Sequence, residues 1–436
     1  MGDLGAGLAA ILLVALIVIE FPIGFAFAAA SIVLALSSGR DLAVIVPTAL
    51  WQTGGFALLA LPLFIVAGGV MRDAQISDRI VAFIERLVGR FTGSLGAVTV
   101  AACMLFGAIS GSGSAAIAAI GSVMMPKMKQ VGYEPGYAAA LVACSSVLAL
   151  LIPPSIPMIV FALTAGLPVT ACFLSTVGPG LVIGLLFMLL NWRYAKRRGI
   201  DTPAARRALQ QALPARREGV LMTLPALFMP VLMLGGIYAG IFTPTEAAAV
   251  TLLYAVLIGL LFYRSLGVRA LGRTVVEGGS MTASVIAILF FLLVFGKLLA
   301  LEGIPRDIAA FVASLSSDRY VVLLLINLVL LLLGMFLDDI SGSILAAVVL
   351  MPVANDVGIH PIHFAAIVGT NLGLGNVTPP CAPLLFVAGS VARLDLKDFV
   401  RPALRLMLLG HLPVVLLVTY VPELALALPE LLLDLR

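Results

Sequence analysis

An internal repeat of a proline-broken apolar segment is the feature that most constrains this chain. Residues 125–157 and 351–383 align without a gap at a constant offset of 226, and 12 of the 33 aligned positions are identical. Met-Pro, Val-Gly and Pro-Pro-x-x-Pro recur in register in the two segments. Two related halves, each with an apolar segment interrupted by prolines, are typical of secondary transporters, whose broken helices meet near the middle of the membrane.

The composition places this repeat in a lipid bilayer. Of the 436 residues, 62% are hydrophobic and 11% are charged, and the mean hydropathy is +1.17. Soluble domains are about half apolar and about one quarter charged, so a soluble core could not bury this much apolar surface. Apolar runs such as residues 323–333 lack the alternation of a membrane β-strand. We therefore predict an all-α integral membrane protein with an inverted repeat, broken helices and re-entrant hairpins.

Apolar segments of two lengths support this prediction. A spanning helix needs about 20 apolar residues. Segments near or above this length are residues 5–36, 55–71, 94–109, 169–191, 220–241, 246–263, 281–301, 320–337 and 404–428. Shorter segments, which we expect to form half-helices or hairpin arms, are residues 114–126, 137–152, 156–167, 340–354, 362–375 and 380–392.

Each half also contains an amphipathic segment. Residues 76–90 and 304–315 place isoleucine, phenylalanine and leucine on one face, and Arg79 belongs to the polar face of the first segment. We predict that both are helices lying in the membrane interface. Ordinary connecting helices would show the same pattern, so that alternative stays open.

A basic loop separates the two halves. Residues 193–217 contain eight Lys and Arg residues against Asp201 alone. Basic loops are retained in the cytoplasm, so we place this loop on the cytoplasmic side and interpret it as a solvated linker rather than a nucleic-acid site. The cysteines stand alone without metal-ligand spacing, so we expect no transition-metal site; they are Cys103, Cys144, Cys172 and Cys381.

Serines alternate with glycines between two apolar pieces of the first half, at Ser110, Gly111, Ser112 and Ser114. Glycine lets the backbone unwind, which exposes carbonyl oxygens, and serine hydroxyls add further oxygens. A cage of hard oxygens suits Na⁺. The alternative is a helix-packing surface of small residues.

The matching stretch of the second half contains adjacent acids. Asp338 and Asp339 follow a long apolar segment and precede Ser341, Gly342 and Ser343. A carboxylate inside a membrane costs about 2.5–3.5 kcal/mol on insertion scales, so we interpret it as functional. The alternative is that the helix ends at the interface and water solvates both acids.

The double prolines of the two halves form the third pair of motifs. A double proline ends a helix and frees the carbonyls that precede it. We predict that oxygens around both breaks take part in binding, or alternatively that each break is only a hairpin turn. The residues concerned are Pro153, Pro154 and Ser155 with Ser145 and Ser146 before them, and Asn376, Thr378, Pro379 and Pro380 with Thr370 and Asn371 before them.

Two charged residues lie in or near the apolar segment that ends at residue 301. Lys297 has two interpretations, a counter-ion for an anionic substrate or a side chain that extends to the membrane interface. Glu302 follows the apolar segment directly.

These motifs resemble a known family. Residues 107–126, 132–166, 236–250 and 376–389 are similar to the large membrane subunit of tripartite ATP-independent periplasmic (TRAP) transporters, the DctM-like family, and the similarity extends over essentially the whole chain. The resemblance implies an elevator-type transporter of the bacterial inner membrane that imports an organic acid and is driven by a Na⁺ gradient. It also implies a separate small four-helix DctQ-like membrane subunit and a periplasmic substrate-binding protein as partners.

One stretch departs from the family pattern. The family more often has a single acid followed by small or polar residues, whereas this chain has Asp338, Asp339 and Ile340. Which of the two acids faces the site therefore stays open.

From the repeat and the resemblance together we predict six regions. They are scaffold helices with the first interfacial helix (1–92), a first transport-domain repeat (93–168), central scaffold helices with the basic loop (169–280), a scaffold helix with the second interfacial helix (281–319), a second transport-domain repeat (320–395) and a C-terminal helix (396–436).

The predicted Na⁺ site combines backbone carbonyls and hydroxyls from both halves. Its residues are Ser110, Gly111, Ser112, Ser114, Pro153, Asp338, Ser341, Gly342, Ser343, Thr378 and Pro379. Amide groups at the starts of half-helices would attract the substrate carboxylate. The predicted substrate residues are Ser145, Ser146, Pro154, Ser155, Thr370, Asn371, Asn376 and Pro380. We expect no organic cofactor and no enzymatic activity.

Two rival functions remain. A symporter of organic anions that couples to Na⁺ or H⁺ without a binding protein would have similar motifs. An intramembrane hydrolase would use Ser112 as nucleophile, but the histidines offer it no obvious base.

Overall fold

The fold is entirely helical. The computed structural model describes residues 2–19, 21–88, 91–212, 220–315 and 318–433, and every regular element within them is a helix. Eight helices of this part are long and apolar enough to cross a membrane. The prediction of an all-α, multi-pass membrane protein is therefore confirmed.

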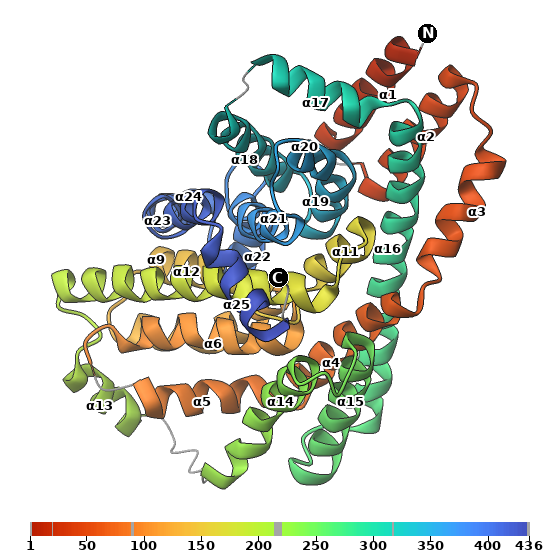
Figure 1. Ribbon diagram of the computed structural model, residues 1–436. Coiled ribbons are helices and arrows are strands. Elements are labelled where there is room, and N and C mark those ends of the chain that lie inside the picture. Colours follow the sequence, from red (N-terminus) through yellow and green to blue (C-terminus); the bar gives the residue numbers. More distant parts are fainter. Residues whose placement is uncertain (1, 20, 89–90, 213–219, 316–317, 434–436) are drawn as a thin grey trace.

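One group of helices forms what we call the frame, which occupies the right side, the top and the lower part of Figure 1. Most of its helices pack on one another, with α16 lying along α2, α3 and α4. They are α1 (Gly2–Val18), α2 (Ile23–Ser38), α3 (Leu42–Thr53), η1 (Phe56–Leu59), α4 (Ala60–Asp73), α5 (Ile76–Val88), α14 (Val220–Tyr238), α15 (Pro244–Leu257), η3 (Ile258–Phe262), α16 (Val268–Leu301) and α17 (Ile304–Leu315).

The remaining helices form the bundle, which fills the centre and left of Figure 1. From the first half it contains α6 (Ser94–Ser110), α7 (Gly113–Ala116), η2 (Ile117–Gly121), α8 (Ser122–Gln130), α9 (Pro135–Ser146), α10 (Leu148–Leu151), α11 (Ile156–Ala165), α12 (Val169–Arg198) and α13 (Pro203–Ala212). From the second half it contains α18 (Arg319–Phe336), α19 (Asp339–Leu345), η4 (Ala346–Leu350), α20 (Met351–Asp356), α21 (Pro361–Gly375), α22 (Pro383–Ala392), α23 (Leu396–Leu406), η5 (Met407–His411), α24 (Leu412–Tyr420) and α25 (Glu423–Leu433).

Local chemistry explains where the first repeat breaks. Gly111 ends α6 with φ +59°, and Ser112 caps α7. The chain reverses there, because α8 packs back against α6. Double proline then interrupts a second helix after Leu151, and Ser155 caps α11 by accepting a hydrogen bond from the Met158 N–H at 3.4 Å.

The second repeat breaks at the matching places. Leu337 is extended between α18 and α19, and the Asp338 side chain caps α19. The chain between α21 and α22 contains the second double proline, and both Pro–Pro peptide bonds are cis. The sequence left open whether each Pro–Pro marks a hairpin tip or an unwound helix. In the first repeat it interrupts one long apolar segment, Pro135–Ala165, so there it unwinds a helix.

The two amphipathic helices connect the frame to the bundle in opposite positions. Figure 1 shows α17 at the top and α5 in the lower part, as expected for two repeats of opposite orientation. The predicted polar face of α5 needs one correction. Arg79 is buried because its guanidinium lies 3.7 Å from the centre of the Tyr263 ring and donates to the backbone carbonyls of Ala74 and Gln75.

Several predicted boundaries differ from the structure. The short helix α3 was not predicted, and α16 begins at Val268 rather than at residue 281 because its polar first turns hid it from an apolar search. Helix α12, which the sequence analysis assigns to the central scaffold helices, packs against α6 and α21.

The basic segment is also more ordered than a solvated loop. Helix α12 continues to Arg198, and α13 follows it. Asp201 and Arg206 are buried against the start of α6. Residues 213–217 of the predicted loop lie outside the described residues.

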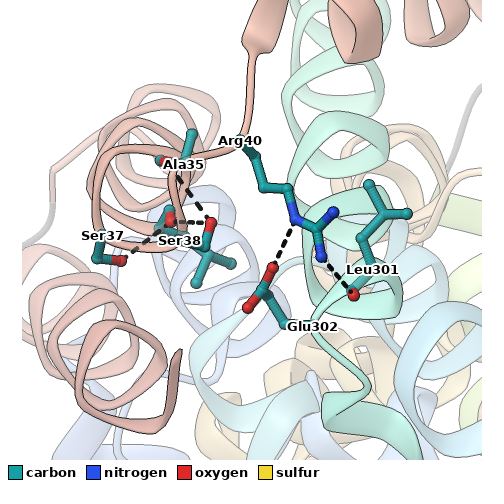
Figure 2. A network of polar contacts seen from close by, with 7 residues as sticks. Ala35, Ser37, Ser38, Arg40, Leu301 and Glu302 are labelled. Atoms are coloured by element: carbon teal, nitrogen blue, oxygen red, sulfur yellow. Dashed lines mark hydrogen bonds and ion pairs between the residues drawn. The ribbon is translucent and has the colours of Figure 1, made fainter. Parts of the chain in front are cut away.

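Glu302 belongs to a contact within the frame, shown in Figure 2. Arg40 donates from Nε to Glu302 Oε1 at 2.9 Å and from Nη2 to the Leu301 carbonyl at 3.2 Å, which joins the ends of α2 and α16. Lys297 is exposed on α16, away from the two cavities described below. This position favours the interpretation of Lys297 as a side chain that extends to the membrane interface.

Candidate ion and substrate site

The turn of the first hairpin touches the first Pro–Pro break. A Cβ atom added to Gly111 would lie 2.4 Å from the carbonyl oxygen of Pro154, so only glycine allows this approach. Next to it, the Ser110 hydroxyl is buried and has no hydrogen-bond partner among the described residues. The structure therefore joins the two polar motifs of the first half, as the sequence predicts.

The second half makes an analogous junction. A Cβ atom on Gly375, at the end of α21, would lie 2.5 Å from the Cα atom of Gly334 in α18. Beside this contact, Asp338 Oδ2 accepts hydrogen bonds from the N–H groups of Ile340 and Ser341 at 3.2 and 3.5 Å. Its other oxygen, Oδ1, is buried without a partner in the described chain.

The broken helices of the two halves interlock. Helix α11 of the first half packs against α19 of the second, and α22 of the second half packs against α7 and η2 of the first. At Gly113, an added Cβ atom would lie 3.1 Å from a methyl carbon of Leu384. Residues more than 200 positions apart are thereby brought to one place.

A cavity of about 360 Å³, which we call the site cavity, lies at this junction. Asp338 and Asp339 both line it, so the cavity does not single out one of the two acids as the residue that faces the site. The first residues of α11 and α22 line it too. Its lining residues are Gly111, Ser112, Gly113, Ser114, Ile156, Met281, Ser284, Val285, Asp338, Asp339, Ile340, Asn376, Pro383, Leu384 and Val387.

An adjoining cavity of about 260 Å³, which we call the frame cavity, shares Ser112, Ser114, Ile156 and Met281 with the first. It extends to charged side chains of the frame. Arg72 of α4 forms ion pairs with Asp73 at 3.3 Å and with Glu277 of α16 at 3.6 Å.

Sequence reasoning missed this frame contribution. Arg72, Glu277, Met281 and Ser284 belong to α4 and α16, and only the packing of the bundle on the frame brings them to the cavities. The one available signal was a pair of opposite charges at the ends of apolar helices, which is too common to identify a site.

Some predicted residues support the site without lining the site cavity. Ser110 lines the frame cavity, and Ser145, Ser155 and Ser341 are buried. Ser146 and Ser343 donate to the carbonyls of Ala143 at 2.7 Å and Asp339 at 2.6 Å. Gly342 packs closely on Leu372, and Pro153 and Pro154 form the break that faces Gly111.

Thr370 and Asn371, which the sequence analysis assigns to the substrate site, line neither of the two cavities. Asn371 Nδ2 donates to Asn327 Oδ1 at 2.6 Å, and Asn327 Nδ2 donates to Thr419 Oγ1 at 3.0 Å. The carbonyl of Thr370 contacts His411 Nε2 at 2.9 Å. These residues face α18 and α24 inside the bundle, because they occupy a side of α21 that does not line the cavity.

Of the predicted residues around the second double proline, one lines the site cavity and the others do not. Asn376 lines the site cavity, and its Oδ1 atom has no partner in the described chain. Thr378 donates to the carbonyl of Leu374 at 2.7 Å, and neither it nor Pro379 or Pro380 lines the two cavities.

The unsatisfied oxygens fit a cation. Buried polar atoms in folded proteins almost always have partners. Within the described residues, six predicted site residues have a buried side-chain oxygen without one. Four of these oxygens belong to residues next to the hairpin turns and the second double proline: Ser110 Oγ, Asp338 Oδ1, Ser341 Oγ and Asn376 Oδ1. The other two are Ser145 Oγ and Asn371 Oδ1. Hard oxygens of this kind suit a small cation such as Na⁺.

Comparison with known proteins agrees with this architecture. Residues 10–424 match the family described as the tripartite ATP-independent periplasmic transporter, DctM component. This chain belongs to the DctM family. It is 36% identical over 86% of its length to the C4-dicarboxylate TRAP transporter large permease protein DctM of Pseudomonas aeruginosa, 86% of which is covered. It is 35% identical over 94% of its length to the sialic acid TRAP transporter large permease protein SiaM of Vibrio cholerae, 95% of which is covered.

Two further matches concern a longer relative and the fold. The isethionate TRAP transporter permease protein DctMQ of Oleidesulfovibrio alaskensis is 36% identical over 93% of this chain, which covers only 63% of that longer relative. The crystal structure of the Alcanivorax borkumensis YdaH transporter has a TM-score of 0.66 at 14% identity, covers 87% of this chain and is itself 88% covered, so it supports the fold. Because its relatives are named as permease subunits, this DctM-family chain is a transporter subunit and not an enzyme.

Proposed function

We propose that this DctM-family chain is the large membrane subunit of a Na⁺-coupled importer of an organic acid. The observation that carries the proposal is the site cavity, where both broken repeats contribute oxygens. Relatives are named for C4-dicarboxylate, sialic acid and isethionate, which are all organic anions. We therefore assign this chain an organic anion as cargo.

Na⁺ would bind oxygens near the hairpin turns. In the first half these are Ser110, Ser112 and the Pro154 carbonyl, and in the second half they are Asp338 and Asn376. Several of these atoms have no hydrogen-bond partner among the residues that the structure describes, which supports this assignment. A carboxylate ligand adds the negative charge that a monovalent cation needs in a low-dielectric site.

The anionic group of the cargo would lie against the starts of two half-helices. Ile156 begins α11, and Pro383 begins α22, and both residues line the site cavity. The N-terminus of a helix carries a partial positive charge, which attracts an anion. Bound Na⁺ would offset the charge of Asp338, so that ion and anion bind together.

Transport would follow an elevator mechanism. The bundle carries the site, and the frame surrounds one side of it through α4 and α16. The helices α5 and α17 connect the two parts from opposite positions. Movement of the bundle relative to the frame would expose the cavity first to one side and then to the other, and only a closed, loaded site would move.

The partners and location follow from the family. We assign the chain to a bacterial inner membrane with residues 193–217 in the cytoplasm, beside a small four-helix DctQ-like subunit. A periplasmic binding protein would deliver the cargo. The relative named DctMQ supports the pairing with a small subunit.

Reconstituted uptake tests the proposal. Proteoliposomes would contain this chain and the small subunit, and the partner substrate-binding protein would be added outside. We expect uptake only with an inward Na⁺ gradient. Undiminished uptake after the gradient is dissipated would refute the coupling, and uptake without the binding protein would favour the rival symporter.

The cargo can be identified separately. Thermal unfolding of the binding protein would be followed against a panel of organic acids that includes isethionate, a C4-dicarboxylate and sialic acid. We expect one class of organic acid to raise its melting temperature.

A further inference from the structure

A basic cleft lies on the bundle, away from the site cavity. Its volume is about 480 Å³, and it lies where the end of α12, the start of α9 and the second half of α23 meet. Its lining residues are Glu134, Tyr137, Leu190, Arg193, Tyr194, Arg197, Arg198, Arg401, Pro402, Arg405, Leu406 and Leu409.

The charges of this basic cleft are unbalanced. It is lined by five arginines and one carboxylate, Glu134, which pairs with Arg198. Within the described chain no ion pair engages the other four arginines, which all expose their side chains. Guanidinium groups in this arrangement suit phosphate, to which arginine can donate two parallel hydrogen bonds.

The floor of the cleft is rigid and aromatic. The rings of Tyr137 and Tyr194 stack with centres 3.6 Å apart and planes within 2°. Tyr194 also donates to Glu134 at 3.3 Å. The stacked tyrosine rings therefore form a fixed surface on one side of the arginines.

Exposed leucines lead from the arginines along α12. Leu181, Leu185 and Leu189 are 52%, 66% and 50% exposed, and Arg193 and Arg197 continue the same four-residue spacing. Residues four apart share one face of a helix. Leu189, the last of these leucines, therefore adjoins Arg193 on the surface of α12.

The facing helix repeats this pattern. Arg401 and Arg405 are followed by Leu408 and Leu409, which are 56% and 60% exposed. A ligand with a phosphate at one end and hydrocarbon at the other matches both helices, whereas a soluble phosphate would leave the leucines unused.

We propose that this cleft is a specific binding site for an anionic phospholipid. The phosphodiester lies among Arg193, Arg197, Arg401 and Arg405, and the acyl chains run along the leucines of α12 and η5. Basic pockets between membrane helices are suited to anionic headgroups. The inference rests on the membrane placement of the bundle and not on Na⁺ coupling, so loss of one proposal leaves the other intact.

Thermal unfolding of the purified full-length chain in detergent tests the site. The probes are dioctanoyl phosphatidylglycerol, dioctanoyl phosphatidylcholine and glycerol 1-phosphate. We expect the melting temperature to rise with phosphatidylglycerol and to stay unchanged with the other two. Since each arginine near a membrane surface contributes about 1 kcal/mol, Arg193→Gln with Arg405→Gln should raise the half-effective phosphatidylglycerol concentration about 30-fold.

The matched control is Arg269→Gln with Arg273→Gln, which removes the same charge from exposed positions of α16 and should leave the titration unchanged. Arg193→Lys with Arg405→Lys keeps the charge but not the paired hydrogen bonds, so it should weaken the effect less than the Gln pair does, which separates charge loss from misfolding. An equal rise with phosphatidylcholine would overturn the anionic specificity. An equal rise with glycerol 1-phosphate would identify a site for soluble phosphates rather than lipids. If the Gln pair titrates like the wild type, Arg193 and Arg405 do not belong to the lipid site.

Discussion

Ser112 and Asp338 are the residues that face the site cavity from the two hairpin turns. Loss of one oxygen ligand costs about 1–3 kcal/mol, which corresponds to roughly 5- to 150-fold in affinity. We expect Ser112→Ala and Asp338→Asn each to raise the half-saturating Na⁺ concentration for uptake about tenfold, measured in proteoliposomes.

Ser122→Ala is the control for this pair, because Ser122 is exposed on α8, where its hydroxyl donates to the Ala119 carbonyl of the preceding turn at 3.0 Å. It should leave the Na⁺ dependence unchanged. Wild-type Na⁺ dependence in both site variants would exclude these residues from the ion site.

Asp201 is the residue whose protonation should affect stability. Its Oδ2 accepts from the Leu95 N–H at 2.7 Å and from the Tyr133 hydroxyl at 3.1 Å, at the base of the first hairpin. Burial raises the pKa of Asp201 to about 6, above the usual value of about 4. The folded chain therefore holds this proton more tightly than the unfolded chain, and protonation favours folding.

We expect Asp201 to make the protein more stable as the pH falls from 7 through 6 towards 4. Asp201→Asn keeps an oxygen acceptor but cannot titrate, so it should remove this part of the pH dependence. The measurement is the melting temperature of both proteins between pH 7 and pH 5. If the two curves run parallel, the carboxyl of Asp201 does not have a raised pKa.

At the scale of elements, the hairpin turn and the broken helix of the first half depend on Gly111. Alanine there would have φ +59° and a Cβ atom 2.4 Å from the Pro154 oxygen. Unfavourable backbone conformation alone costs about 1–3 kcal/mol, and the clash adds to it. We expect Gly111→Ala to lower the melting temperature and to abolish uptake.

Gly166→Ala separates the two causes. Gly166 has φ +69°, and an added Cβ atom there would meet nothing within 4 Å. It should lower the melting temperature less than Gly111→Ala and retain uptake. Equal losses in both variants would mean that the contact with Pro154 contributes nothing.

The sequence predicted the helix breaks, but it did not predict every helix. Prolines and glycines interrupt helices through their own backbone geometry, so the breaks at Gly111, Pro153 and Pro379 were predictable. Helix α3 and the first turns of α16 were missed, because short or polar helices at the edge of a membrane lack a long apolar run.

At the scale of the whole molecule, the proposed movement of the bundle can be blocked. A Cβ atom on Gly296 of α16 would lie 3.4 Å from the Cβ atom of Val348 in η4, close to the usual separation of about 3.8 Å in a disulfide. We expect Gly296→Cys with Val348→Cys, in a Cys381→Ser background, to lose uptake on oxidation and to regain it on reduction.

A disulfide within the frame is the matched control. A Cβ atom on Gly278 of α16 would lie 3.6 Å from the Cβ atom of Val66 in α4. Gly278→Cys with Val66→Cys should therefore tolerate oxidation. If the bundle–frame disulfide forms and uptake persists at the level of this control, the bundle does not slide along α16.

The sequence by itself determined that this chain is a helical membrane protein with two related, broken repeats. Those properties depend on apolar length and on local backbone chemistry, which each segment carries within its own residues. It also identified the hairpin turns that contribute Ser112 and Asp338.

Only the tertiary structure decided which oxygens face the cavity. It directed Asn371 to Asn327 instead of the site, brought Arg72 to the adjoining cavity and placed α12 in the bundle. A helix presents several faces of similar composition in lipid, and which face meets which neighbour depends on close packing between segments far apart in the chain. The hydrophobic periodicity of one segment does not show which neighbour each of its faces contacts.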